Sequence, residues 1–436
     1  MRHGTLRASR RRTLPLALAA ALLALVAGSA AGAQVQTTIT VDTTSDVADF
    51  GGAQTVADLP GPDGQTSFRE ATIASTNTAG PETIAFDIPT SDPGFGGSGF
   101  TITTAAGAES LTLGDDGTTI DATTQPGGFA ITLDGPGQAE FVRGLFVTSS
   151  GNAVIGLGVR DYSNGIEVRG GSDNLVTGVT VTENGQGISL AGSEVGTGNE
   201  VSDSTIRDNG LGFAVTFTAD IVLDGNTIAG NDRRGVFVND ADELTVTDNL
   251  IDGNAFFGIE HSGGTGGIAA GNTITGNGLG GIVVSGGVFT EGFTISRNVI
   301  SENDGLGINL LGGKEDADGV TRNDAQDRDD GGNDLLNYPE RLMASDDGAA
   351  TVVEGRVSFP DPESLTIELF ANEVPDPSGH GEGGEFVGTA TPDAKGRFTA
   401  TLPAGLAGQW ITATATDAAG NTSEFSEAVL VGVPKK

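Results

Sequence analysis

Asn226-Thr-Ile-Ala-Gly-Asn231, Asn249-Leu-Ile-Asp-Gly-Asn254 and Asn272-Thr-Ile-Thr-Gly-Asn277 are three copies of one pattern, each starting 23 residues after the one before. Every repeat contains short segments in which apolar and polar residues alternate, and no helical stretch lies between them. Three short strands with their turns in such a period form one coil of a parallel β-helix. Leucine-rich repeats have the nearest period, but the regular leucine spacing is missing. The pattern therefore predicts an all-β chain.

The asparagines form two columns in this alignment. The first column is Asn184, Asn209, Asn231, Asn254, Asn277 and Asn303, and the second is Asn226, Asn249, Asn272 and Asn298. We expect these residues to occupy left-handed corners and to stack amide on amide along the helix axis. A glycine followed by an apolar residue, such as Gly187-Ile188, opens a strand after each unit, where a positive φ or a close approach requires glycine. About ten coils are predicted over residues 84–311.

The repeat is flanked at both ends by sequence of a different kind. Residues 34–83 contain the one convincing helix pattern, over residues 67–76, with Ser67 as N-cap and Glu70 completing a capping box. Phe68 and Ile73 would plug the first coil, because an open end of the β-helix would template aggregation. Residues 312–344 form an acidic junction, and residues 345–436 contain the six or seven alternating strands of a small antiparallel, immunoglobulin-like β-sandwich.

Residues 1–33 are interpreted as a signal peptide. A basic start precedes the apolar run Leu14–Ala27, and Ala31-Gly32-Ala33 suits cleavage by a signal peptidase. A membrane anchor, the alternative, needs about 18 or more apolar residues. Ser9-Arg-Arg-Arg-Thr-Leu14 resembles a twin-arginine signal, so the general secretory route and the twin-arginine route stay open. We expect a secreted or cell-surface protein with no transmembrane segment in the mature chain.

Composition excludes several classes of function. The formal net charge of −36 repels phosphate backbones, which excludes nucleic acid as a natural partner. The absence of cysteine excludes disulfides, cysteine-ligated zinc and thiol catalysis. The 70 glycines lack the strict spacing of collagen, and 37% of the residues are hydrophobic, so an extended apolar core can form.

Several stretches resemble exported bacterial right-handed parallel β-helix proteins of the CSLREA-containing type, which have the pectin-lyase-like fold. The matching stretches are Thr38–Asp46, Thr66-Ser-Phe-Arg-Glu-Ala71, Pro81–Phe86, Asp318–Asp324, Asn337-Tyr-Pro339 and Thr412–Phe425. In the name-giving motif, threonine replaces the cysteine and phenylalanine replaces the leucine. The resemblance implies export and a right-handed β-helix. It does not specify a function, because this fold carries pectin and alginate enzymes, phage tailspikes and adhesins.

Catalysis on a polysaccharide would require polar side chains on neighbouring coils. Hydrolysis needs two carboxylates about 5–10 Å apart, but Glu167 and Glu260 in the outward register lie four coils apart, roughly 19 Å. The best remaining group contains a possible base and cations on two adjacent coils. Its members are Asp232, Arg233, Arg234, Glu260 and His261. These residues are weak candidates, because charged residues in turns are usually solvated.

The acidic junction is a candidate calcium site. Asp and Asn alternate there with Gly, and Ca²⁺ takes six to eight oxygen ligands from flexible loops of this kind. The predicted ligands are Asp316, Asp318, Asp324, Asp327, Asp329 and Asp330. The spacing of an EF-hand is not met, and a solvated acidic linker is an equally good interpretation.

Together these features favour binding or adhesion at the cell exterior without catalysis. The expected partner is a polysaccharide or a cell-surface glycan. The alternative is a polysaccharide lyase or glycoside hydrolase that acts on an acidic polysaccharide.

Overall fold

The computed structural model describes residues 36–192 and 196–433, with the side chains of residues 287–289 left out. The predicted signal peptide, residues 1–33, lies outside the described residues. Within them no helix is long and apolar enough to cross a membrane. The described chain is almost entirely β-structure, with one α-helix, α1 (Phe68–Asn77). Short 3-10 helices occupy Val56–Asp58, Ala122–Thr124, Pro126–Gly128, Gln138–Glu140, Gly332–Leu335 and Pro362–Ser364.

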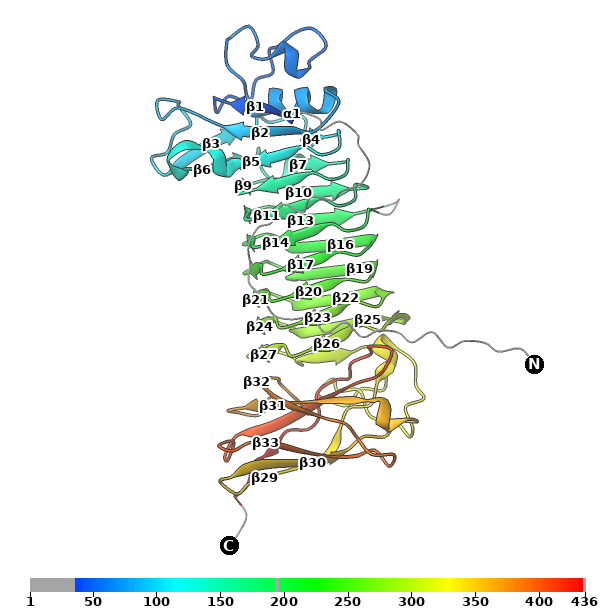
Figure 1. The fold of residues 1–436 in the computed structure, drawn as a ribbon. Coiled ribbons are helices and arrows are strands. Elements are labelled where there is room, and N and C mark those ends of the chain that lie inside the picture. Colours follow the sequence, from blue (N-terminus) through cyan, green and yellow to red (C-terminus); the bar gives the residue numbers. More distant parts are fainter. Residues whose placement is uncertain (1–35, 193–195, 434–436) are drawn as a thin grey trace, which may run out of the picture. The chain divides into compact units, whose positions relative to one another are not determined.

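Three parallel sheets run along the repeat (Figure 1), and from β2 onward the chain visits them in the order A, B, C in each coil. Sheet A contains β1 (Thr37–Val41), β2 (Glu82–Phe86), β5 (Thr119–Asp121), β8 (Ala153–Ile155), β11 (Leu175–Thr177), β14 (Glu200–Ser202), β17 (Val222–Asp224), β20 (Thr245–Thr247), β23 (Ile268–Ala270) and β26 (Thr294–Ser296). Sheet B contains β3 (Gly99–Thr103), β6 (Ala130–Asp134), β9 (Leu157–Arg160), β12 (Thr180–Thr182), β15 (Thr205–Arg207), β18 (Thr227–Ala229), β21 (Leu250–Asp252), β24 (Thr273–Thr275) and β27 (Val299–Ser301). Sheet C contains β4 (Leu111–Leu113), β7 (Arg143–Val147), β10 (Asn164–Arg169), β13 (Gln186–Ala191), β16 (Leu211–Ala219), β19 (Val236–Asp242), β22 (Phe257–Thr265), β25 (Gly280–Glu291) and β28 (Ile308–Leu310). The predicted parallel β-helix is confirmed.

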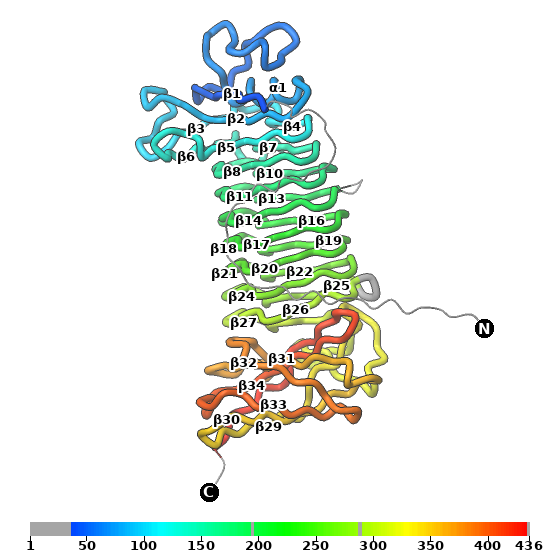
Figure 2. Tube along the Cα trace, viewed as in Figure 1, coloured from blue at the N-terminus to red at the C-terminus, as the bar shows by residue number. Residues whose placement is uncertain are grey.

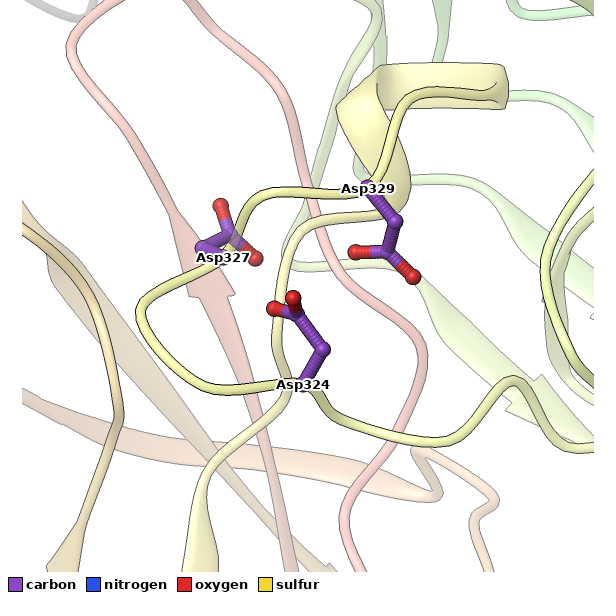
Figure 3. Close-up of side chains that lie close together, drawn as sticks. All are labelled: Asp324, Asp327 and Asp329. Carbon is purple, nitrogen blue, oxygen red and sulfur yellow. The ribbon is translucent and has the colours of Figure 1, made fainter.

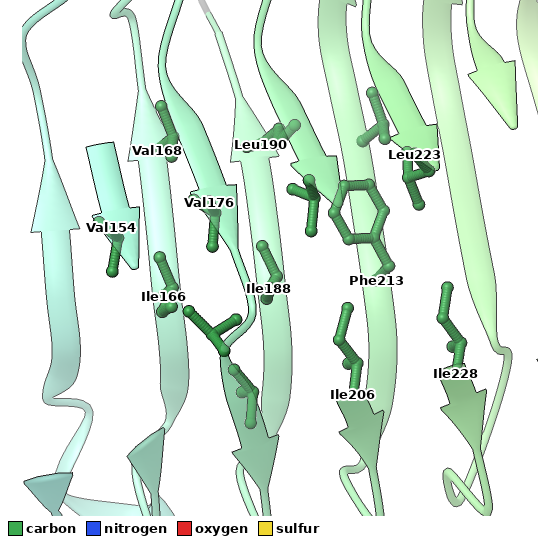
Figure 4. Close-up of a cluster of buried hydrophobic side chains, with 14 of the residues drawn as sticks. Val154, Ile166, Val168, Val176, Ile188, Leu190, Ile206, Phe213, Leu223 and Ile228 are labelled. Atoms are coloured by element: carbon green, nitrogen blue, oxygen red, sulfur yellow. The ribbon is translucent and has the colours of Figure 1, made fainter. Parts of the chain in front are cut away.

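The interior of the coils is filled by stacked hydrophobic side chains (Figure 4). Ile251 and Ile274 are paired in register on β21 and β24, and both are fully buried, as the repeat predicts. The strand-opening glycines are required by close approach, because a Cβ on Gly187 would lie 2.5 Å from the carbonyl oxygen of Gly212. The alternation of the sequence therefore directs apolar residues of each short strand into the core.

The asparagine columns form hydrogen-bonded ladders. In the first column, for example, Asn277 donates through Nδ2 to Oδ1 of Asn303 at 2.9 Å, and its own Oδ1 accepts from Asn254 at 3.0 Å. The second ladder runs from Asn226 to Asn298 in the same way. A third ladder, which the repeat alignment missed, contains Asn152, Asn174 and Asn199.

The predicted corner conformation is wrong by one residue. The asparagines of the ladders are not left-handed, and the residue before each one is. Glu183, Asp208 and Glu302 have φ of 59°, 57° and 60°, while Gly230, Gly253 and Gly276 occupy the same place in the intervening coils. The left-handed residue makes the corner, and the asparagine that follows is free to point inward and bond its neighbours.

Helix α1 caps the first coil, as predicted. Ser67 accepts a hydrogen bond from the Glu70 amide at 3.1 Å, and Glu70 accepts one from the Ser67 amide at 2.9 Å, which completes the capping box. Phe68 is fully buried under the first strands, whereas Ile73 is only half-buried. The rest of the predicted plug is supplied by Ala71 and Ala74.

The C-terminal residues form the predicted antiparallel sandwich. Sheet D contains β29 (Glu340–Asp346), β30 (Ala350–Arg356) and β33 (Arg397–Pro403), and sheet E contains β32 (Glu385–Ala390), β31 (Thr366–Asn372), β34 (Trp410–Thr416) and β35 (Val429–Leu430). The sandwich lies directly against the last coil (Figure 2), and the β-helix and the sandwich belong to one compact unit.

Three glutamates of the sandwich bind the exposed end of the β-helix, one at each sheet. Glu368 accepts hydrogen bonds from Ser296 Oγ (2.7 Å) and from the Arg297 amide (2.9 Å) after sheet A. After sheet B, Glu382 accepts a hydrogen bond from Asn303 Nδ2. At sheet C, Glu424 accepts hydrogen bonds from the amide of Leu310 and from the amide of Thr321. The sandwich therefore acts as the C-terminal cap, because it satisfies backbone groups that an open edge would expose.

Candidate functional site

The outer face of sheet C carries a cluster of charged and aromatic side chains near its N-terminal end. Arg143, Phe146, Glu167 and Arg169, here called the first cluster, come from β7 and β10. Glu167 points away from the core but is only 1% exposed, because Arg143 and Arg169 both form ion pairs with it. The Arg143 guanidinium lies 4.6 Å from the centre of the Phe146 ring, within the range of a cation–π contact.

A second cluster of the same kind lies further along the same face. It contains Arg234, Phe237, Phe256 and Glu260. Arg234 forms an ion pair with Glu260, and its guanidinium lies 4.9 Å from the Phe237 ring and 5.8 Å from the Phe256 ring. Phe256 remains 38% exposed. Both clusters therefore combine an arginine, a glutamate and an aromatic ring on the outer face of sheet C.

Strand register places the two clusters in one column. The paired outward residues of successive strands are Phe146, Glu167, Ser189, Ala214, Phe237 and Glu260. Ser189 and Ala214 occupy the positions of this column between the two clusters, and both are buried. At about 4.8 Å per strand, Glu167 and Glu260 are roughly 19 Å apart, as the sequence predicts.

The structure divides the predicted group of catalytic candidates. Arg234 and Glu260 are brought together, and Asp232 and Arg233 are exposed in the neighbouring turn. His261, in contrast, lies on the opposite face of β22 and is completely buried in the core. The placement of His261 beside the other four residues is therefore corrected: successive residues of a strand face opposite sides, so His261 cannot share a surface with Glu260.

His261 has an unusual environment for a histidine. Its ring stacks on Phe293 at 4.4 Å, and neither ring nitrogen has a hydrogen-bond partner. Burial lowers its pKa to about 4, although the negative charge of Asp242 acts in the opposite direction. The neutral imidazole is the form that fits this site.

We expect His261 to weaken the protein as the pH falls. The unfolded chain binds a proton at the ordinary pKa of 6.5, whereas the folded chain does so only near pH 4. Stability should thus be complete above pH 6.5 and decline below it, by about 3 kcal/mol at most. His261→Leu, which copies Leu190 of the same column, should remove this part of the decline. Urea unfolding of both proteins at several pH values measures the difference, and parallel curves would contradict the prediction.

The acidic junction brings three of the six predicted metal ligands together (Figure 3). One carboxylate oxygen each of Asp324, Asp327 and Asp329 lies within 4.8 Å of the others. Burial raises the pKa of Asp327 to about 7, and the charges of Asp329 and Asp324 add to this effect. Asp329 Oδ1 is buried without a hydrogen-bond partner. Along residues 36–192 and 196–433, no arginine or lysine nitrogen lies within 4.0 Å of these carboxylates.

The other predicted ligands are placed elsewhere. Asp316 caps its own turn, because its Oδ1 accepts hydrogen bonds from the amides of Asp318 and Val320, and these bonds lower its pKa. Asp318 and Asp330 are exposed and lie outside the group of three. The predicted set of six is therefore reduced to three residues that could hold one cation.

A separate cavity of about 410 Å³ lies beside Tyr338 and His380 at the start of the sandwich. The two rings meet edge to face at 5.1 Å, and His380 Nδ1 donates to the carbonyl oxygen of Phe425 at 3.1 Å. Burial raises the pKa of Tyr338 to about 12, with smaller effects from Glu424 and Glu340. No local motif in the sequence connects His380 with Tyr338, 42 positions earlier.

Two family models match parts of the chain. Residues 143–291 match the model described as right handed beta helix region, and residues 380–431 match the model described as bacterial Ig domain. A comparison with curated proteins gave no match.

Several solved structures are similar to this chain at low sequence identity. An alginate lyase from Paenibacillus sp. str. FPU-7 is 15% identical, with 64% of this chain and 88% of that chain covered and a TM-score of 0.45. Tailspike protein 2 of bacteriophage CBA120 is 10% identical, with 80% and 69% covered and a TM-score of 0.36. A periplasmic alginate epimerase is 17% identical, with 56% and 63% covered and a TM-score of 0.34.

Proposed function

We propose that this chain, which matches the models of a right handed beta helix region and a bacterial Ig domain, binds a polysaccharide outside the cell without cleaving it. The binding surface is the outer face of sheet C. The predicted signal peptide supports export, by either the general secretory or the twin-arginine route. The surface would serve attachment to a glycan of the cell exterior.

The observation that carries this proposal is the pair of clusters on sheet C. Ligand sites combine apolar and aromatic surface with a few fixed polar groups, and each cluster offers both. The arginines are held in place by their glutamates and rings, which lowers the entropy lost on binding. A long polymer can contact both clusters at once and gain avidity.

The same geometry argues against catalysis on this face. Glu167 and Glu260 are each bound to arginine and are too far apart to act on one glycosidic bond. His261 is buried away from the surface. In the cavity at the start of the sandwich, Tyr338 would also be a poor base, because its pKa is about 12 and its acidic neighbours repel a uronate. A lyase or hydrolase remains the alternative function.

Affinity electrophoresis in gels containing neutral or uronate polysaccharides tests the proposal. The wild-type protein should be retarded by at least one of them. Phe146→Ala combined with Phe237→Ala should weaken that retention by about tenfold or more, because both rings are lost from the clusters. The matched control is Leu250→Ala with Val299→Ala, which removes partly exposed apolar side chains from sheet B. The control should bind like the wild type.

Two results would overturn this function. Release of unsaturated ends or new reducing ends from any polysaccharide of the panel would favour the enzyme. Equal weakening by the sheet B control would show that sheet C is not the binding surface.

We also propose that Asp324, Asp327 and Asp329 bind Ca²⁺ and thereby stabilise the junction. The support is the mutual approach of their carboxylate oxygens, with no arginine or lysine nitrogen within 4.0 Å among the described residues. Three carboxylates are hard oxygen ligands of the kind Ca²⁺ prefers, and the loop could add backbone carbonyls. Because the sandwich already contacts the last coil through its glutamates, we expect the ion to strengthen the loop without changing the orientation of the sandwich.

Calcium should raise the melting temperature at concentrations where sodium chloride of equal ionic strength has no effect. Replacing Asp324, Asp327 and Asp329 with asparagine should abolish this difference. Asparagine at Asp316, Asp318 and Asp330 changes the net charge equally and should preserve it. Identical melting curves in calcium and in chelator, at matched ionic strength, would leave the junction as a plain acidic linker.

A further inference from the structure

Three arginines meet on the outer face of sheet D, and one of them, Arg341, also borders the cavity beside Tyr338 and His380. Arg341, Arg356 and Arg397 line a surface depression of about 740 Å³. Glu354, Asp393, Thr399, Met343, Phe398 and Pro392 also contribute to the lining. In a chain with a net charge of −36 and 22 lysines and arginines, three arginines around one depression are a strong local exception.

Two of these arginines are placed where their like charges destabilise the folded protein when no ligand is bound. Arg356 on β30 lies directly opposite Arg397 on the antiparallel strand β33. Like charges in that position destabilise a sheet. Arg397 is compensated by Asp393, to which its Nη2 donates at 2.7 Å. Arg356 has no carboxylate within 4.0 Å in the described part of the chain, and its Nε is buried without a hydrogen-bond partner.

The direction of the third arginine, Arg341, is set by an irregularity in the edge strand β29. The register of β29 and β30 shifts between Glu340 and Met343, so that Arg341 lies in a bulge. Arg341 has a φ of 56°, a left-handed conformation that a long side chain rarely adopts. Bulges of this kind re-aim a side chain. Arg341 is exposed and, like Arg356, has no carboxylate within 4.0 Å among the described residues.

We propose that this depression, the sheet D site, binds a uronate unit of an acidic polysaccharide. The carboxylate of the sugar would lie between Arg341 and Arg356, where guanidinium groups can form paired hydrogen bonds with it. Glu354, Asp393 and Thr399 would accept hydrogen bonds from the sugar hydroxyls. Met343, which is 62% exposed, would contact the apolar face of the ring.

The lining favours a sugar acid over a dense polyanion. A nucleic acid or a polyphosphate places several charges close together, and Glu354 and Asp393 would repel them. The negative field of the whole chain opposes such ligands as well. A uronate has one charge surrounded by hydroxyl groups, which matches a site where arginines and carboxylates alternate. The sheet D site is independent of sheet C, so either surface could bind without the other.

Titration calorimetry with tetragalacturonate tests the proposal on the whole chain. Arg341→Gln combined with Arg356→Gln should weaken binding by about tenfold or more. The matched control is Arg322→Gln with Arg328→Gln, two exposed arginines of the junction, which changes the net charge equally. The control should change binding less than about twofold. Cellotetraose, which is neutral, and inorganic sulfate should bind the wild-type protein far more weakly than tetragalacturonate.

Stability separates a binding role from a structural one. Because Arg356 faces Arg397, the double variant at the site should melt at the same temperature as the wild type or higher. A clear fall in melting temperature would indicate a structural role and overturn the proposal. If the site variant and the control variant weaken tetragalacturonate binding equally, the arginines act only through long-range charge and not through a site. Equal affinity for sulfate would indicate an unspecific anion site. Self-association that only the site variant abolishes, without uronate binding, would assign the surface to a second copy.

The two proposed binding surfaces, on sheet C and on sheet D, can be tested separately. Phe146→Ala with Phe237→Ala should leave tetragalacturonate binding at the sheet D site unchanged. If that variant removes all binding and the variant at Arg341 and Arg356 removes none, sheet C alone is the glycan surface.

Discussion

Replacing Phe425 with alanine is expected to lower the free energy of unfolding by about 3–5 kcal/mol. Phe425 follows β34 in the sandwich, yet its ring is 3% exposed and belongs to the core of the β-helix. It packs against Gly307 in the last coil and against Phe370, whose ring centre is 5.4 Å away. The substitution would leave a cavity at the place where the cap closes the β-helix. Urea unfolding at neutral pH measures the change.

The chain offers a control for this substitution. Phe141 is 86% exposed, and Phe141→Ala should change stability by less than about 0.5 kcal/mol. The Phe425 variant should also aggregate more readily, because a loosened cap exposes the edges of three sheets. If both phenylalanine variants unfold at the same urea concentration as the wild type, the sandwich does not close the β-helix.

Ile274→Ala is expected to cost about 2–5 kcal/mol. Ile274 lies between Ile251 and Ile300 in the stack of sheet B and is fully buried, so the lost methyl groups would leave a void. Asn277→Ala should cost less, about 1–3 kcal/mol, by breaking the ladder between Asn254 and Asn303. Chemical denaturation gives both values.

The control for this pair lies on the neighbouring strand. Leu250 on β21 is 39% exposed on the outer side of sheet B, one residue before the inward Ile251. Leu250→Ala should cost well under 1 kcal/mol, since exposed positions lose little on truncation. An unchanged melting midpoint for both Ile274→Ala and Asn277→Ala would mean that the strand register is wrong.

Much of the fold could be predicted because the β-helix is nearly one-dimensional. Each coil contacts only its neighbours, so a 23-residue repeat such as Asn249 to Asn272 already defines which residues stack. The inward position of Ile274 and the amide ladder at Asn277 followed from alternation and from identity between repeats. The corner conformation did not, because the alignment could not tell whether the asparagine or the preceding residue, such as Glu183, takes the positive φ.

The site was less predictable, because it depends on the exact face of each residue. One position in a strand decides between surface and core, and His261 lies on the core side of β22. The first cluster was missed because Arg143 and Phe146 lie in a coil where the repeat is irregular. Only the hydrogen-bonded register aligned them with Glu167.

The sequence by itself determined the class of this protein: a β-helix of short strands with stacked asparagines, an N-terminal helical cap and a separate run of longer strands. These features are local or periodic, so neighbouring residues encode them. Only the tertiary structure decided that the sandwich caps the β-helix through Glu368, Glu382 and Glu424, and that Arg341, Arg356 and Arg397 share one surface. Those contacts join residues far apart in the chain or on paired strands, and no repeat specifies them. They arise because buried edges must find hydrogen-bond partners and because strand pairing sets distant side chains next to one another.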